Sequence, residues 1–95
     1  MDPNGSPGYR MKKLARTLPS LSPLFDDLRP WDATWLDQWA GTASHGERAS
    51  AQFLLAVWDP NQEWPCGRFD AMDALRVWDE PHRAAFLDWA KAGRE

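Results

Sequence analysis

One cysteine and two histidines are the side chains of this sequence best suited to chemistry. Cys66 lies in the run Trp-Pro-Cys-Gly, which is similar to redox motifs but lacks the second cysteine that dithiol exchange requires. A nucleophilic thiol needs a base, and only His45 and His82 are available for that role. These two histidines also lack the helical spacing of a zinc site. We therefore expect no catalytic residue, no metal and no cofactor.

Acidic residues occur in close pairs, as acid–base catalysis would require. The pairs are Asp26 with Asp27, Asp70 with Asp73, and Asp79 with Glu80. Most of them lie at expected helix ends, where capping and the helix dipole account for them. The sequence contains no glycine-rich phosphate loop and no serine nucleophile motif. We therefore expect a protein that is not an enzyme.

Tryptophan departs most from ordinary usage, with seven in 95 residues. Each indole brings roughly 200 Å² of mostly apolar surface and an N–H donor. Because of their four-residue steps, Trp31, Trp35 and Trp39 should form one stripe on a helix. A domain this small cannot bury every indole, so we expect Trp31 and Trp64 to stay exposed as anchors for a partner. The tryptophans expected in the core are Trp35, Trp39, Trp58, Trp78 and Trp89.

The elements that position these residues are helices set off by proline, glycine and capping residues. Ser44 and Glu47 have the spacing of a capping box before an apolar run that ends at Trp58. Asp70 should cap the next helix, and Pro81 should open the last. Helices are expected near residues 22–28, 31–40, 44–59, 70–79 and 81–92, after a helical turn or two over 11–18. With no period-two segment, the sequence predicts an all-α fold, a compact bundle of four to five short helices.

The amino-terminal segment differs from the rest in composition and charge. Residues 1–10 are typical of a disordered or tag-like segment, and residues 11–95 should form a single helical domain. Residues 1–19 carry four basic and one acidic side chain, a net charge of +3. Residues 20–95 carry seven basic and thirteen acidic side chains, a net charge of −6. We therefore expect no binding of nucleic acid, except weakly through this flexible basic arm.

Composition also indicates a compartment. No apolar run approaches the roughly 18 residues that a membrane span needs, and the sequence starts without the apolar stretch of a signal peptide. One cysteine cannot form an internal disulfide. We expect a cytoplasmic protein that does not enter membranes. In overall pattern the chain resembles small proteins of bacteria and phages, without a motif diagnostic of any family.

These observations favour a small non-enzymatic protein–protein interaction module, acting as an adaptor, inhibitor or regulator. It would dock an aromatic patch with an acidic rim on another protein, or on a second copy of itself as a homodimer. The expected partner-binding residues are Trp31, Trp64, Asp59 and Glu63. One alternative is an acidic inhibitor that occupies the basic groove of a nucleic-acid-handling protein. The other is a small-molecule binder with a tryptophan-lined pocket.

Overall fold

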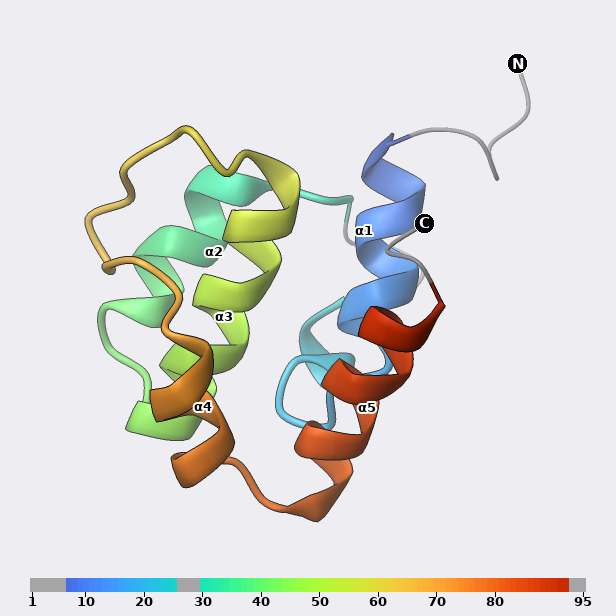
Figure 1. The fold of residues 1–95 in the computed structure, drawn as a ribbon. Helices are drawn as coiled ribbons and strands as arrows, with labels where there is room; N and C mark the ends of the chain where they lie inside the picture. The colour runs from blue at the N-terminus through green and yellow to red at the C-terminus, as the bar shows by residue number, and fades with distance from the viewer. Residues whose placement is uncertain (1–6, 26–29, 93–95) are drawn as a thin grey trace.

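The computed structural model describes residues 7–25 and 30–92, and these residues form helices joined by short connections (Figure 1). No strand occurs in either described range, so the prediction of an all-α bundle is confirmed. None of the described helices is both long and apolar enough to span a membrane. In chain order the elements are α1 (Pro7–Ala15), the 3₁₀ helix η2 (Ser22–Leu24), α2 (Ala33–Ala40), α3 (His45–Trp58), α4 (Ala71–Val77) and α5 (Glu80–Lys91).

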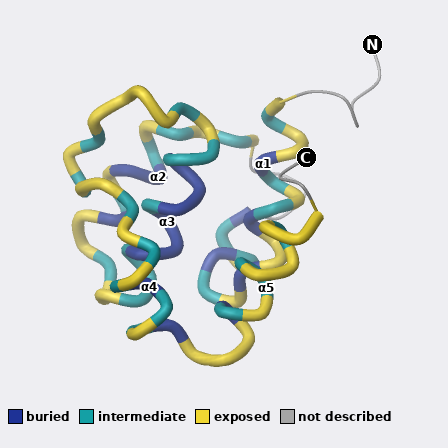
Figure 2. Tube along the Cα trace, in the orientation of Figure 1, coloured by how far each residue is buried: buried dark blue, intermediate teal, exposed yellow. Residues whose placement is uncertain are grey.

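The central helix is α3, against which α1, α2 and α4 all pack. Its start is fixed by the expected capping box. Ser44 Oγ accepts the Glu47 N–H at 3.3 Å, and Glu47 Oε1 accepts the Ser44 N–H at 2.9 Å. The apolar face that follows includes Phe53, Leu54 and Leu55, each with 2% or less of its surface exposed. Figure 2 shows buried positions lying mainly along α2, α3 and the segment after α1.

The amino-terminal part of the chain contributes to the core more than its composition suggested. Residues 7–10, expected in a disordered arm, belong to α1, because Met11 and Ala15 bury the apolar side of this helix against the domain. The expected arm at residues 1–6 lies outside the described residues. After α1 the chain turns, and Leu18, Leu21 and Phe25 are fully buried. Of the helix expected over residues 22–28, only the 3₁₀ turn lies within the described part.

The last helix, α5, is attached to the domain through large side chains. The Phe53 ring of α3 contacts Phe86 and Trp89 of α5, with ring centroids 5.3 and 5.0 Å apart. Edge-to-face geometry at these distances is favourable for aromatic rings. His82, in the first turn of this helix, is buried.

The distribution of tryptophans differs from the prediction at six of the seven positions: only Trp78 is buried as expected, and Trp35, Trp39 and Trp89, expected in the core, are half-buried. Trp58, expected in the core, is the last residue of α3 and is 39% exposed. Trp31 and Trp64, expected at the surface, are half-buried and pack against the core. Trp31 also lies outside α2, because Asp32 caps that helix by accepting the Trp35 N–H at 3.1 Å. The expected three-residue stripe is therefore reduced to Trp35 and Trp39.

Candidate functional site

Trp58 and Trp31 form an aromatic pair at the carboxyl end of α3. Their ring centroids are 5.4 Å apart, and Trp31 also stacks on Phe25 at 5.7 Å. Gly8 of α1 approaches the same place, since a Cβ at that position would lie 3.6 Å from the Trp31 Cβ. Trp31 is therefore the half-buried residue of the pair, against which the exposed Trp58 packs.

The other expected partner-binding residues lie in the loop after Trp58. Asp59 and Trp64 line a small cavity of about 120 Å³, and Glu63 is exposed. The structure therefore brings Asp59 to both tryptophan sites, because it follows Trp58 in the chain and faces Trp64 in the cavity. The indole Nε1 atoms of Trp31 and Trp64 are enclosed without a hydrogen-bond acceptor among the described residues. A buried N–H without an acceptor costs about 1–3 kcal/mol. Ring contacts with Phe25 and Trp58 hold Trp31 in place, and Trp64 packs against the core.

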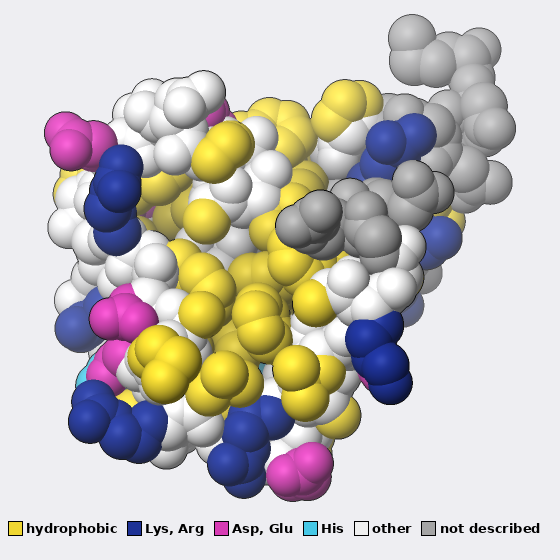
Figure 3. Space-filling view, viewed as in Figure 1, with side chains coloured by type: hydrophobic (Ala, Val, Ile, Leu, Met, Phe, Trp, Pro, Cys, Tyr) yellow, Lys and Arg dark blue, Asp and Glu magenta, His cyan; other side chains and the backbone are white. Residues whose placement is uncertain are grey.

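A broad apolar face covers the region between α3 and α4 on one side and α5 on the other (Figure 3). Phe53 lies at the centre of the ring contacts that join these elements. Its centroid is 5.4 Å from Phe69, 5.3 Å from Phe86 and 6.2 Å from Trp78. Phe69 and Phe86 are half-buried. The face is therefore the outer edge of the aromatic core that holds α5 in place.

A chain of hydrogen bonds joins Asp79, His82 and Ser20 in the order of a catalytic triad. His82 Nδ1 lies 2.6 Å from Asp79 Oδ1, and His82 Nε2 lies 2.9 Å from Ser20 Oγ. However, the backbone N–H of Ser20 also points at His82 Nε2, at 3.1 Å. A neutral imidazole has one acceptor nitrogen, and the N–H competes with the hydroxyl for it. The arrangement is better suited to fastening a loop than to activating a nucleophile.

Cys66 lies beside the buried carboxylate of Asp37, which nothing in the sequence distinguishes from the other acidic residues. Asp37 is 8% exposed, and its Oδ1 accepts the Cys66 N–H at 2.9 Å. Burial raises the pKa of the Cys66 thiol to about 12, and the side-chain hydrogen bonding of the thiol to Asp37 and the charge of this carboxylate act in the same direction. A thiol with this pKa is protonated at neutral pH, and the protonated form is a poor nucleophile.

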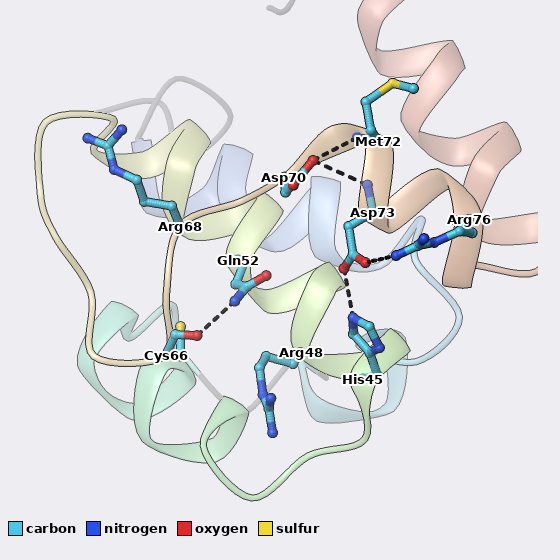
Figure 4. Close-up of a pocket in the computed structure, with 9 residues that line it drawn as sticks. All are labelled: His45, Arg48, Gln52, Cys66, Arg68, Asp70, Met72, Asp73 and Arg76. Atoms are coloured by element: carbon cyan, nitrogen blue, oxygen red, sulfur yellow. Dashed lines mark hydrogen bonds and ion pairs between the residues drawn. The ribbon is translucent and has the colours of Figure 1, made fainter.

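A second, larger cavity of about 500 Å³ lies between α3, residues 66–70 and the start of α4 (Figure 4). Its floor includes His45, Arg48 and Gln52, which share one side of α3 because they are three and four residues apart. The loop approaches α3 closely at Gly67, whose φ is 103° and where a Cβ would lie 3.0 Å from Gln52 Nε2. The stripe of His45, Arg48 and Gln52 was not predicted from the sequence, although its spacing of three and four residues is visible there.

The remaining polar clusters carry no metal site. Within residues 7–25 and 30–92, no group of three or more His, Cys, Asp or Glu side chains is placed to hold a metal ion. Asp73 bonds His45 at 2.7 Å and Arg76 at 2.8 Å. These two hydrogen bonds, that of His45 first, hold the pKa of Asp73 below its ordinary value.

No protein-family model, curated protein or solved structure matches this chain.

Proposed function

We propose that this protein is a small protein–protein interaction module whose principal anchor is Trp58. The observation that carries the proposal is the exposure of this indole at the end of α3. Its contact with Trp31 fixes the ring before any partner arrives, which lowers the entropy lost on binding. Partly exposed aromatic residues with a fixed position are frequent hot spots at protein interfaces.

The surroundings of Trp58 favour a partner of defined chemistry. Asp59 follows it directly, and the exposed Glu63 lies in the same loop next to Trp64. An aromatic anchor with carboxylates nearby complements an apolar pocket bordered by lysine or arginine. The proposed surface therefore consists of Trp31, Trp64, Asp59 and Glu63 together with Trp58. Trp31 and Trp64 support this surface by packing, and Trp58 is the residue that inserts into the partner.

A quantitative capture experiment with matched variants tests this proposal. Trp58→Ala should reduce capture of a specific partner about tenfold or more, because a buried aromatic hot spot contributes at least about 2 kcal/mol. Leu87→Ala removes another exposed apolar side chain, on α5, and should leave capture unchanged. Near-ultraviolet circular dichroism of each variant checks that the domain stays folded. Equal capture by the wild type and the folded Trp58→Ala variant would contradict the proposal.

The same experiment separates the other candidate functions. Binding that is lost in high salt but insensitive to Trp58→Ala would favour the acidic inhibitor of a basic groove, because screening weakens charge-led association. Light scattering of the purified chain detects a homodimer, and Trp58→Ala should dissociate it if the partner is a second copy. A tryptophan-lined pocket has less support: the larger cavity has no tryptophan in its lining, and the smaller has only Trp64.

A further inference from the structure

We propose that the cavity between α3, residues 66–70 and α4 binds a small oxyanion, a ligand that carries a phosphate or carboxylate group. The first argument is the balance of charge in its lining. Asp70 caps α4 by accepting the N–H groups of Met72 at 3.0 Å and Asp73 at 3.2 Å. Asp73 in turn is bonded by His45 and Arg76. Both carboxylates are therefore already engaged.

The arginines Arg48 and Arg68 are the lining charges without a carboxylate partner in the described part of the chain. Asp37, the buried carboxylate behind Cys66, is bonded to the Cys66 N–H instead. The protein as a whole has a net charge of −3. The lining of the cavity holds three arginines and two aspartates, a net charge of +1 that is opposite in sign to the charge of the whole protein, so oxyanions should bind here rather than over the surface in general.

The second argument is that the floor of the cavity is preorganised. Arg48 donates through Nε to the Ala40 carbonyl at 3.1 Å and through Nη2 to the Ala43 carbonyl at 3.3 Å. Within residues 7–25 and 30–92, no acceptor is bonded to its other N–H groups. Gln52 Nε2 donates to the Cys66 carbonyl at 2.7 Å, which fixes the neighbouring side chain. Side chains that are held before binding lose little entropy when a ligand arrives.

Size and polarity define the class of ligand. A volume of about 500 Å³ suits a small molecule rather than a single ion. Met72 is the one large apolar residue in the lining, so a polar ligand fits better than an apolar one. The planar guanidinium matches the paired oxygens of phosphate and carboxylate groups. Figure 4 shows Arg48 and Arg68 at separate ends of the site, so the exposed Arg68 side chain must turn inward to reach the same ligand.

Titration of the ¹⁵N-labelled protein with inorganic phosphate and with citrate, at constant ionic strength in chloride, tests this site. We expect saturable shifts of the backbone amides of Arg48, Gln52 and Cys66. Stronger binding of phosphate would identify a phosphate-bearing ligand, and stronger binding of citrate a carboxylate. Shifts that do not saturate with either probe, or that chloride alone reproduces, would overturn the proposal.

Paired variants keep the test independent of folding and of net charge. Arg68→Gln removes an exposed side chain that bonds to none of the described residues and should weaken phosphate or citrate binding about tenfold. Arg10→Gln on α1 removes the same charge outside the cavity and should leave the dissociation constant unchanged. Equal weakening by both variants would show that only net charge matters and would overturn the site. This result does not depend on Trp58 or on a protein partner.

Discussion

His82 Nε2 accepts the backbone N–H of Ser20 at 3.1 Å, across 62 residues of sequence. Because a backbone N–H is always a donor, this nitrogen must be the acceptor of the ring, and the proton lies on Nδ1. Nδ1 then donates to Asp79 Oδ1 at 2.6 Å. The buried imidazole thus fastens the segment after α1 to the start of α5.

Replacement of this imidazole should destabilise the domain. His82→Ala leaves the Ser20 N–H without its acceptor, which should lower the free energy of unfolding by about 1–3 kcal/mol. Ser20→Ala keeps the backbone donor and should lower it by less than about 1 kcal/mol. Urea denaturation measures both values. Equal losses in the two variants would mean that the hydroxyl, and not the backbone N–H, makes the important contact.

Asp79 should contribute to acid unfolding. The hydrogen bond from the His82 ring, and then that from the His82 backbone N–H, hold the pKa of this carboxyl below its ordinary value. Because the pKa of Asp79 is lower in the folded protein than in the unfolded chain, its ionised form stabilises the fold at pH values above the ordinary carboxyl pKa. This stabilisation is lost as the pH falls through the pKa of the folded state. Asp79→Asn should therefore flatten the decline of unfolding free energy below about pH 4. Glu80→Gln changes the charge equally and is the control.

The Cys66 thiol should be slow to react in the folded protein. With a pKa raised to about 12, mainly by burial, almost no thiolate is present at pH 8. We expect the reaction with an aromatic disulfide reagent to be at least about a hundredfold slower than in denaturant. Asp37→Asn removes the carboxylate charge that also raises this pKa and should speed the reaction. A folded rate equal to the denatured rate would contradict the assigned environment.

Trp58, at the end of α3, and Trp78, directly after α4, should differ in their contribution to stability. Trp78 is 4% exposed, and its Nε1 donates to Ser50 Oγ at 2.9 Å. Trp78→Ala should therefore lower the free energy of unfolding by about 3–5 kcal/mol. Trp58→Ala removes a ring that is 39% exposed and should lower it by less, about 2 kcal/mol. Chemical denaturation that gives the reverse order would contradict the exposure of Trp58.

The sequence alone determined the fold class and most helix positions. The helix expected over residues 44–59 spans His45–Trp58, and that expected over 81–92 spans Glu80–Lys91. The predicted caps at Ser44 and Asp70 are also confirmed. These features could be predicted because a cap bonds to N–H groups within a few residues of itself, and helical spacing is a property of the local chain.

Only the tertiary structure decided which side chains are covered. Trp58 and Trp78 both lie at the end of an apolar helix face, and nothing local distinguishes the exposed residue from the buried one. The same holds for the cavity over Arg48, which exists because residues 66–70 fold back across α3. Burial depends on contacts between segments far apart in sequence, and these are set by how all the helices pack together.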